Sequence, residues 1–377
     1  MSFNLMRNAR MFYTTNVDSN TGVVNAGGFT AANTREIQIL DGMSFSQKTT
    51  SETINLAEAG IAPVRGQRSY NTALDPVDFS FSTYIRPAGD GTNITAEESV
   101  LWNSLMTGKT SGTDAWSEDT TAATLVATYS QAHQLKAFGL VIVVDTVTYI
   151  VDNCALDTAV IDFGLDAIAT IVWTGKGTKL RQVSGITASK TSPVTFSGFT
   201  GLSNEAKAKD TSAAYIANKL SVLSITKGIG ATGTAYSVAL TGGSLTISNN
   251  ITYLTPANLG IVNQPITYFT GTRAISGTIN AYLRAGSTNS AGLLANMLAS
   301  SSSDVNPDFS ITLSIGGSTN PIRVEIELPA SVLTIPSVDT QKVISTAINF
   351  TAQGSTGSAF DVTQSNEAEI RYYAVNA

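Results

Sequence analysis

The amino-acid sequence predicts a mainly β protein built as a tandem duplication. Each copy is expected to be a small β-sandwich or half-barrel domain with a long hairpin and one flanking helix. Two observations lead to this prediction. Segments rich in Val, Ile, Thr, Tyr and Phe alternate with polar residues or run apolar, which is typical of strands. Several of these segments also recur in the same order in both halves of the chain, which indicates an internal repeat.

Turn-forming pairs separate segments with strand patterns. Gly-containing pairs such as Asp41-Gly42, Asp90-Gly91 and Gly316-Gly317 predict these turns. The strand-like segments are residues 35–47, 77–87, 138–151 and 168–177, and the apolar run Leu140–Val144 predicts a buried strand.

Convincing helices are few. Residues 96–106 (AEESVLWNSLM) place apolar side chains on one face at helical spacing. Thr95 precedes them and Glu98 follows three residues later, the pattern of a capping box in which two side chains bond the free N–H groups of the first turn. We therefore predict a helix from Ala96 to Met106 with Thr95 as its N-cap.

The repeat is clearest at a Tyr-aliphatic-Arg strand. STYIRPAG (82–89) recurs as NAYLRAG (280–286), which aligns Tyr84 with Tyr282 and Arg86 with Arg284. Other segments recur in the same order: 7–15 as 217–225, 37–54 as 238–254, 101–106 as 293–298, 138–144 as 309–315, and 167–177 as 345–354.

Two of these pairs carry specific expectations. In 37–54 and in 238–254 we expect a strand, a tight Gly turn and a second strand. The last pair aligns Trp173 with Phe350 and Thr174 with Thr351. The alternative is that hairpins rich in small residues look alike without duplication.

The repeat implies a division of the chain. We predict a first domain at residues 1–185, a second domain at 215–377, and a linker between them at 186–214. The linker is rich in Ser, Thr, Gly and Lys and has little apolar content for a core.

The composition is low in charge. Of the 377 residues, 42% are apolar and 13% are charged, whereas soluble domains usually carry about a quarter. Such a composition suits a chain that buries much of its outer surface in an assembly. The net charge is −6, and basic groups such as Arg65 and Arg68 are too scattered for a nucleic-acid-binding stripe. A mildly acidic wall would instead repel DNA.

Nothing in the sequence predicts export or membrane insertion. The single cysteine, Cys154, cannot form an intramolecular disulfide. The N-terminal segment lacks an apolar core of signal-peptide length, and no stretch approaches the roughly 20 apolar residues of a membrane helix. We therefore expect cytoplasmic synthesis, use without Sec export and no membrane partner.

With these elements in hand, the chain resembles the tube proteins of long-tailed bacteriophages. The segments that carry the resemblance are 51–87, which is similar to the family's hairpin, loop and strand, and 152–177 and 326–354, which are similar to its C-terminal strands. The resemblance implies that hairpins of neighbouring domains join into a continuous β-barrel around a DNA channel.

The resemblance also implies an assembly. Most tube proteins carry one domain and form hexameric rings, whereas some siphophage tubes carry a fused pair and form trimeric rings with pseudo-sixfold symmetry. The duplication favours the second type. The implied partners are further copies of the chain, the tape measure, the tail terminator and the baseplate or tip, with DNA passing through the lumen unbound. The implied location is the virion tail, assembled in the host cytoplasm.

The repeated Tyr-aliphatic-Arg is the most distinctive shared feature, so we place Tyr84, Arg86, Tyr282 and Arg284 at equivalent assembly interfaces. There the arginines would pair with carboxylates of the next domain. Arg65 and Arg68 are added because they lie in the predicted hairpin region. The alternative is that these arginines end strands and face water.

No catalytic, cofactor or metal site is expected. A thiol protease would need Cys154 and His133 held together by a third group, and no family signature surrounds either residue. One histidine and one cysteine also exclude ordinary zinc ligation. WTGKGTK (173–179) lacks the first Gly of a phosphate loop and the Ser or Thr after its Lys.

The carboxylates Asp157, Asp162 and Asp166 lack the alternating ligand spacing of a calcium loop. They are better explained as solvated strand ends.

Three rival functions stay open at this point. One is a two-domain β-sandwich binding module or adhesin of a phage fibre or decoration protein, which predicts glycan binding and no polymer. Another is a true hexameric ring with the second domain decorating the outside. The third is a β-rich polysaccharide hydrolase, which would need an acidic pair in a cleft and would turn over a glycan.

Overall fold

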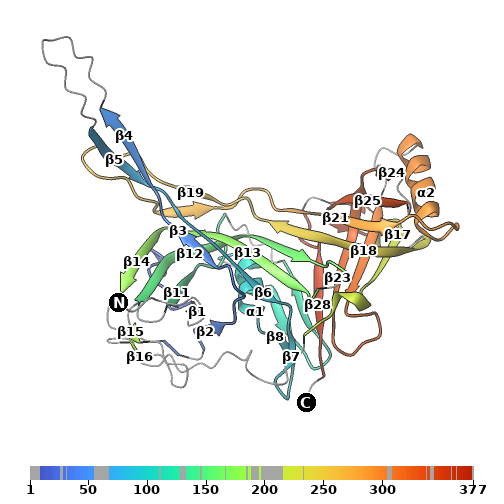
Figure 1. The fold of residues 1–377 in the computed structure, drawn as a ribbon, viewed down its shortest axis with the longest axis horizontal. Coiled ribbons are helices and arrows are strands. Elements are labelled where there is room, and N and C mark those ends of the chain that lie inside the picture. The colour runs from blue at the N-terminus through green and yellow to red at the C-terminus, as the bar shows by residue number, and fades with distance from the viewer. Residues whose placement is uncertain are drawn as a thin grey trace, which may run out of the picture.

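The computed structural model describes residues 9–25, 29–30, 32–54, 68–109, 112–127, 133–144, 147–165, 167–183, 186–187, 195–196, 215–231, 233–303, 308–336, 338–339, 344–357, 359–361 and 363–375. Strands dominate, and the α-helices within these ranges are α1 (Ser99–Met106) and α2 (Ser290–Ser303). The mainly β fold class is therefore confirmed (Figure 1).

The first half of the chain forms what we call the first module, residues 9–183. In order, its strands are β1 (Ala9–Thr14), β2 (Thr34–Ile37), β3 (Ser44–Ser46), β4 (Thr49–Ile54), β5 (Arg68–Leu74), β6 (Val77–Tyr84), β7 (Pro87–Gly89), β8 (Ile94–Ala96), β9 (Trp116–Glu118), β10 (Ala123–Val126), β11 (Phe138–Val144), β12 (Val147–Asp162), β13 (Thr170–Gly177) and β14 (Lys179–Val183). The antiparallel order is β2–β1–β11–β12–β13–β6–β3. Its end strands β2 and β3 follow one another along the chain, and in the described residues β2 pairs with β1 and β3 pairs with β6.

The second half forms the second module, residues 215–375. In order, its strands are β17 (Val222–Lys227), β18 (Ala235–Ser248), β19 (Thr252–Leu254), β20 (Thr267–Phe269), β21 (Ala274–Tyr282), β22 (Phe309–Ile315), β23 (Arg323–Leu333), β24 (Val338–Asp339), β25 (Ser345–Ala352), β26 (Ser355–Thr356), β27 (Ala359–Phe360) and β28 (Glu369–Tyr373). The short 3-10 helices η3 (Asn218–Leu220) and η4 (Ile229–Ala231) flank β17. The ring β18–β17–β22–β23–β25–β21–β18 is closed and antiparallel throughout.

The two modules share the same order of paired strands. β1, β11, β12, β13 and β6 of the first module occupy the places of β17, β22, β23, β25 and β21 of the second. A β-bulge falls at the same point in both: the β11–β12 register shifts between Phe138 and Leu140, and the β22–β23 register shifts between Phe309 and Ile311. A shared bulge at aligned positions supports the tandem duplication, because such bulges are specific features of a fold.

The longest strand, β12, serves two sheets. Its first part pairs with β11 and β14, and its last part pairs with β13 and β18. Between these parts Asn153 has a φ of 48°, in the left-handed region that Asn tolerates better than most residues, and its N–H donates to the Gly22 carbonyl at 2.9 Å. This bend brings the end of β12 to the second module.

The predicted capping box is wrong. α1 begins at Ser99 instead of Ala96, and Glu98 is its N-cap without a side-chain capping bond. Thr95 lies in β8, where its hydroxyl donates to Glu118. The Glu98 carboxylate is buried and accepts a hydrogen bond from Tyr372 at 2.7 Å, so a distant partner takes the group that the local pattern assigned to the helix start. The predicted apolar face is present and buried.

The predicted turn at Gly242-Gly243 is also wrong, although Asp41-Gly42 does form a turn. β18 runs through both glycines with a bulge between Leu240 and Gly242. A Cβ on Gly243 would lie 2.2 Å from the Thr278 carbonyl and 2.6 Å from the Phe163 ring. Gly243 therefore allows close approach of a neighbouring strand and a phenyl ring, and it does not form a turn.

A reciprocal glycine–phenylalanine pair occupies the same place in both modules. Phe79 on β6 lies opposite Gly175 on β13, and Gly277 on β21 lies opposite Phe350 on β25. Phe79 and Gly277 are counterparts, because they precede the repeated tyrosines Tyr84 and Tyr282 by the same number of residues. Their partners across the sheet, Gly175 and Phe350, are therefore counterparts too. A Cβ on Gly175 would lie 2.5 Å from the Phe79 ring, and one on Gly277 would lie 2.5 Å from the Phe350 ring. Each ring thus covers the glycine across the sheet.

The aligned register of the last strand needs a shift of two residues. Because Thr170 pairs with Tyr84 and Ser345 pairs with Tyr282, the counterpart of Trp173 is Ile348, not Phe350. Matching the two aromatic residues gave the wrong register. The phenyl ring that covers a glycine comes from β6 in the first module and from β25 in the second.

Most of the predicted linker, 186–214, lies outside the described residues. Within it the structure describes β15 (Ile186–Thr187) paired with β16 (Thr195–Phe196). The domain boundaries at 185 and 215 stay a prediction.

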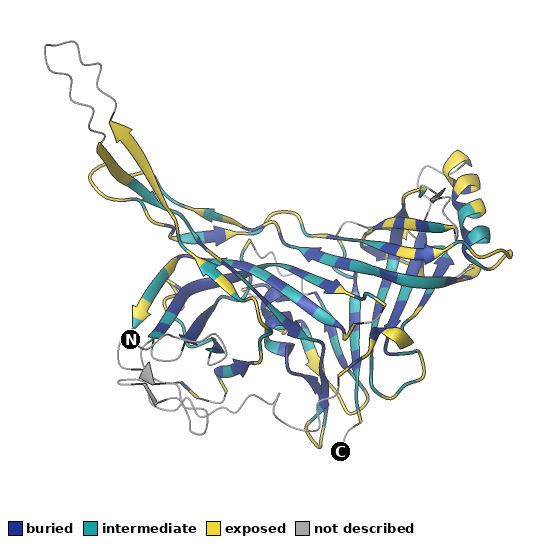
Figure 2. Cartoon of the chain, in the orientation of Figure 1, coloured by how far each residue is buried: buried dark blue, intermediate teal, exposed yellow. Residues whose placement is uncertain are grey.

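The most exposed element is the β4–β5 hairpin. Every residue of β4 is exposed, as are the first residues of β5, and the hairpin projects away from both barrels (Figures 1 and 2).

We expect Gly175→Ala and Gly277→Ala each to lower the free energy of unfolding by about 1–3 kcal/mol, because the added Cβ overlaps a phenyl ring and a carbonyl oxygen. Combining Gly175→Ala with Phe79→Ala should cost less than the sum of the two changes, since the ring is then gone. Chemical denaturation measures these values. Gly112→Ala, which meets open space, is the matched control, and a Gly175→Ala chain as stable as this control would contradict the account.

Candidate assembly interface

The two modules are joined by main-chain pairing. The end of β12 runs antiparallel to β18, from Thr158 opposite Ser248 to Asp162 opposite Ser244. The Asn249 N–H extends the ladder by donating to the Asp157 carbonyl at 2.8 Å. One sheet, β3–β6–β13–β12–β18–β21–β25, therefore crosses from the first module into the second.

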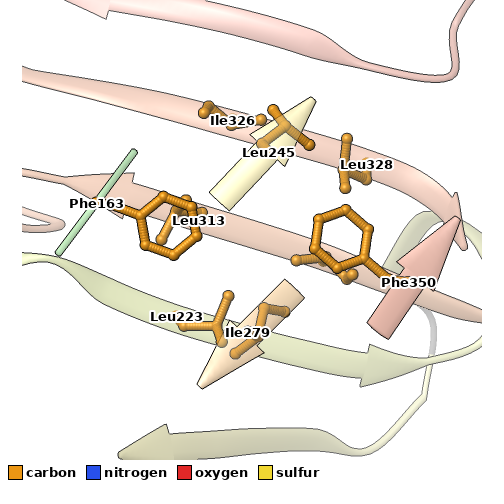
Figure 3. Close-up of a pocket in the computed structure, with 9 residues that line it drawn as sticks. Phe163, Leu223, Leu245, Ile279, Leu313, Ile326, Leu328 and Phe350 are labelled. Carbon is orange, nitrogen blue, oxygen red and sulfur yellow. The ribbon is translucent and has the colours of Figure 1, made fainter. Parts of the chain in front are cut away.

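A phenyl ring from the first module fills the core of the second. Phe163 follows β12 and is 3% exposed, and its N–H donates to the Gly243 carbonyl at 3.1 Å. The ring lies among aliphatic side chains and a phenyl ring of the second module (Figure 3): Leu223, Leu245, Ile279, Ile311, Leu313, Ile326, Leu328 and Phe350. Fully burying such a ring contributes on the order of 1.5–3 kcal/mol.

The β19–β20 hairpin of the second module docks on the outside of the first. Tyr268 is 2% exposed, and its hydroxyl donates to the Leu135 carbonyl at 2.7 Å. Its ring packs in an apolar cluster with Leu135, Ala155 and Ile251. The Tyr253 hydroxyl lies 2.8 Å from the carbonyls of residues 153 and 176. Both tyrosines thus attach the hairpin to main-chain oxygens of the first module.

The C-terminal strand β28 also bridges the modules, because it pairs with β23 on one side and β10 on the other. Its Tyr372 enters the core of the first module. There the Tyr372 hydroxyl accepts from the Trp102 indole at 2.8 Å and donates to the Glu98 carboxylate at 2.7 Å. Burial raises the pKa of Glu98 to about 7, with the neighbouring Glu97 charge adding to the effect.

Two of the predicted interface residues contact the start of the second module within the same chain. The Arg86 side chain is buried, and its Nη1 donates to Glu97 at 3.1 Å and to Gln38 at 2.9 Å. Its guanidinium also lies 4.6 Å from the centre of the Tyr215 ring. The Tyr84 ring meets the same Tyr215 edge-on at 5.2 Å. Arg86 is therefore committed to contacts inside the chain.

The other predicted interface residues differ. Tyr282 and Arg284 are exposed at the end of β21, so the repeated Tyr-aliphatic-Arg lies in two different environments. Arg68 is exposed at the start of β5, and Arg65 lies outside the described residues. A role for these residues at an interface between chains stays a prediction.

Cys154 is fully buried, and burial raises the pKa of its thiol well above the ordinary value. The thiol donates to the Val151 carbonyl at 3.3 Å. His133 is exposed on a separate segment, so the structure does not place a base beside the thiol.

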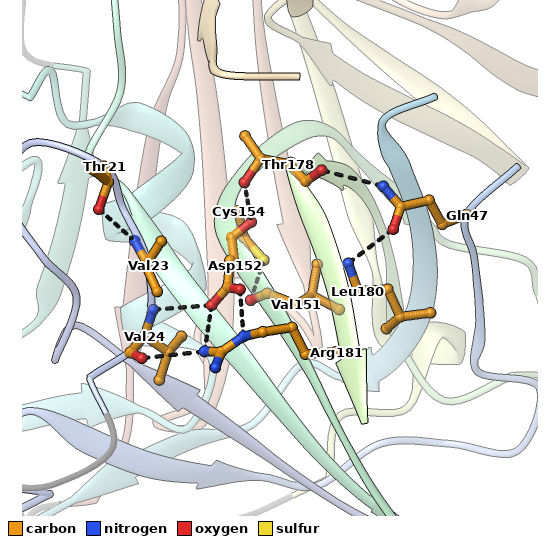
Figure 4. A network of polar contacts seen from close by, with 10 residues as sticks. All are labelled: Thr21, Val23, Val24, Gln47, Val151, Asp152, Cys154, Thr178, Leu180 and Arg181. Atoms are coloured by element: carbon orange, nitrogen blue, oxygen red, sulfur yellow. Dashed lines mark hydrogen bonds and ion pairs between the residues drawn. The ribbon is translucent and has the colours of Figure 1, made fainter. Parts of the chain in front are cut away.

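Next to Cys154 lies a part-buried ion pair that connects β12 to β14 (Figure 4). Arg181 donates from Nε and Nη2 to the two carboxylate oxygens of Asp152, at 2.6 and 2.8 Å. The Val24 N–H donates to the same carboxylate at 2.9 Å. A bidentate pair with a further donor satisfies the buried charge, so this network is structural.

Of the aspartates considered for calcium, the structure describes Asp157 and Asp162, and each accepts a main-chain hydrogen bond. Asp157 accepts from the Ile251 N–H at 2.9 Å, and Asp162 accepts from the Gly164 N–H at 3.1 Å. Asp166 lies outside the described residues. Among the residues that the structure describes, no three His, Cys, Asp or Glu side chains gather as metal ligands. Nor does any helix in those ranges have the length and apolarity to cross a bilayer.

Sequence reasoning missed the residues that join the modules: Phe163, Gly243, Tyr253, Tyr268 and Tyr372. One signal was available. Tyr268 precedes Tyr282 by the same number of residues as Tyr70 precedes Tyr84, so the repeat marked a tyrosine in each hairpin.

Comparison with known proteins identifies a relative that covers most of the chain. The chain is 30% identical over 364 residues to the tail tube protein pb6 of Escherichia phage T5, covering 93% of this chain and 73% of that protein. No family model matches the chain.

The raised pKa of Glu98 predicts how stability depends on pH. The folded chain holds this proton up to about pH 7, whereas an unfolded glutamate loses it near pH 4.5. The folded state therefore binds more protons between these values, and the contribution of Glu98 falls as pH rises from 4.5 through 7. The loss is on the order of 3 kcal/mol.

Unfolding of wild type and Glu98→Gln at pH 5 and pH 8 tests this. Gln keeps an oxygen for the Tyr372 hydroxyl and cannot ionise, so its stability should change less over this range. An unchanged pH dependence in Glu98→Gln would refute the assignment.

Proposed function

Because this chain belongs to the bacteriophage tail tube proteins, a structural family of the virion tail, we propose that it polymerises into stacked rings whose lumen is the channel for DNA ejection. The observation that carries the proposal is the single sheet that crosses both modules. A sheet that continues from module to module can continue from chain to chain, and closure around a ring leaves no free edge.

We propose rings of three chains with pseudo-sixfold symmetry. Each chain supplies two modules with the same connectivity, joined side by side through β12 and β18. Six modules then need three chains. A hexameric ring with the second module decorating the outside is less well supported, because the second module extends the same sheet as the first.

We assign the outer face of this sheet to the lumen. On each strand the residues facing the barrel core alternate with residues facing outward. Paired residues share a face, so the register defines rows across the sheet. One row crosses the junction between the modules and is hydroxylic up to its last member on β21, which is Ala274: Ser44, Ser80, Thr174, Thr158, Ser248 and Ala274.

Two further rows are mainly polar. One is Tyr84, Thr170, Asp162, Ser244, Thr278 and Asn349, and the other is Ser82, Val172, Val160, Thr246, Ser276 and Thr351. Charged groups on this face are Asp78, Asp162 and Lys176, and the Lys176 ammonium lies 3.8 Å from Asp78. Such a face is hydrated and nearly neutral, in place of the acidic wall that the net charge suggested.

A lumen of this kind lets DNA pass without specific binding, because few cations are available to hold phosphates. The proposed protein partners are other copies of the chain, the tape measure, the tail terminator and the baseplate or tip. The protein is proposed to act without catalysis. No observation favours the adhesin or the polysaccharide hydrolase.

Electron microscopy of the purified chain, alone and with its initiating tail partners, tests the ring assembly. We expect hollow tubes of stacked rings, with threefold symmetry in averaged images. True sixfold symmetry would reject the trimer, and a chain that stays monomeric under all these conditions would reject the assembly itself.

The lumen assignment predicts an effect of added charge. Thr174→Lys combined with Thr246→Lys should leave tube formation intact and slow DNA ejection from phage that carry the variant chain by tenfold or more, because each ring then presents new cations to phosphates. Raising the salt concentration should restore the rate. Ser302→Lys on the outer helix α2 is the control. Ejection at the wild-type rate would place this face outside the channel.

A further inference from the structure

The two hairpins of the chain are counterparts in different states. β4–β5 precedes β6 as β19–β20 precedes β21, and each hairpin carries a tyrosine, Tyr70 or Tyr268, at the same spacing before the repeated tyrosine. Tyr268 is 2% exposed and docked on the first module, whereas Tyr70 is 50% exposed. The Tyr70 hydroxyl donates only to Glu52, within its own hairpin, at 2.8 Å.

The first hairpin exposes apolar side chains away from its base, whereas Ala73 and Leu74 at the base are half-buried beside Asn263 of the second module. Ile54 on β4 is 40% exposed, and β4 is exposed along its whole length (Figure 2). An isolated two-stranded hairpin is marginally stable in water. A hairpin that carries exposed Ile and Tyr therefore has the character of a surface that is covered in an assembly.

The surface that receives Tyr268 has a counterpart on the second module. Tyr268 packs on Ala155, which follows Cys154 on β12. Cys154 lies opposite Phe138, and Ser331 lies opposite Phe309 at the same bulge, so Val332 is the counterpart of Ala155. Ala155 is fully buried beneath the hairpin of its own chain, whereas Val332 is only half-buried.

The sheet edges show the same asymmetry. The end of β12 has β13 on one side and β18 on the other. In the described residues its counterpart β24 pairs only with β25, and β3, the counterpart of the central part of β18, pairs only with β6. We call the β12–β18 pairing, with Tyr268 docked beside Ala155, the joint between the modules. The chain forms this joint once. It also carries β24 and β3, the two strands that would form a second joint of the same kind.

We propose that a second copy of this chain completes the second joint, with Tyr70 of the β4–β5 hairpin docked beside Val332 of the neighbouring copy and β3 paired with its β24. The occupant is another copy because both halves of the joint are present on every chain and repeat the joint between its own modules. Such a contact is heterologous, so it propagates until a ring closes. The inference rests on the proposed ring assembly and names the residues that form it.

Tyr70→Ala separates assembly from folding. Because the side chain is half exposed and its hydroxyl bonds Glu52 of the same hairpin, the soluble chain should melt at the wild-type temperature, while the concentration needed for assembly rises about tenfold or more. Tyr268→Ala is the matched variant. It truncates the docked counterpart and should lower the melting temperature of the soluble chain.

A cysteine pair tests the register directly. Tyr70→Cys with Val332→Cys should yield disulfide-linked chains on oxidation of assembled rings, and the largest covalent species reports the number of chains in a ring. Single-cysteine variants are the controls, and buried Cys154 should stay unreactive. If wild-type rings form while Tyr70→Ala assembles normally and the pair gives no cross-link, this inference is wrong. If the wild-type chain itself never assembles, the proposed function fails and this inference fails with it.

Discussion

Main-chain hydrogen bonds between β12 and β18 hold the second module in position on the first, and the other contacts between the modules depend on this position. If the edge of a strand is buried in an interface without a partner, its N–H and C=O groups lose water and gain no hydrogen bond. This costs several kcal/mol for a short strand. Pairing satisfies these groups and sets the register at the same time. With that register in place, Phe163 reaches the core of the second module and Tyr268 reaches the Leu135 carbonyl.

The same constraint explains why the molecule has two unlike hairpins. Within one chain only one such pairing between modules forms, so Tyr268 of the β19–β20 hairpin is covered and Tyr70 of the β4–β5 hairpin is not. Barrel proteins remove free edges by closing a sheet on itself. Here the second module closes its own ring of strands, whereas the strand order of the first module ends in β2 and β3. A hydroxyl-rich outer face suits this arrangement, because Ser and Thr on exposed strand positions stay hydrated without offering an apolar surface for misassembly.

Buried polar groups stiffen the junctions around this sheet. Asp152 and Arg181 tie β14 to the bend of β12, and Arg86 with Glu97 holds the segment that receives Tyr215. Isolated buried charges are costly, so each is paired and given further donors. Glu98 is different, because its main partner is a neutral tyrosine hydroxyl, and burial therefore favours its protonated form.

The sequence by itself determined the mainly β class, the repeated order of elements, and the location of both helices. These features follow from local periodicity and from comparison of the two halves, and neither requires knowledge of distant contacts. The repeat also aligned Tyr84 with Tyr282. The equal spacing of Tyr70 and Tyr268 before these residues would have aligned the two hairpin tyrosines as well. The tertiary structure alone decided which member of each pair is covered. It also decided that Gly243 admits a phenyl ring, that Glu98 bonds Tyr372 in place of capping α1, and that the counterpart of Trp173 is Ile348. Each of these depends on residues brought together from distant parts of the chain, and a local pattern carries no information about such a partner.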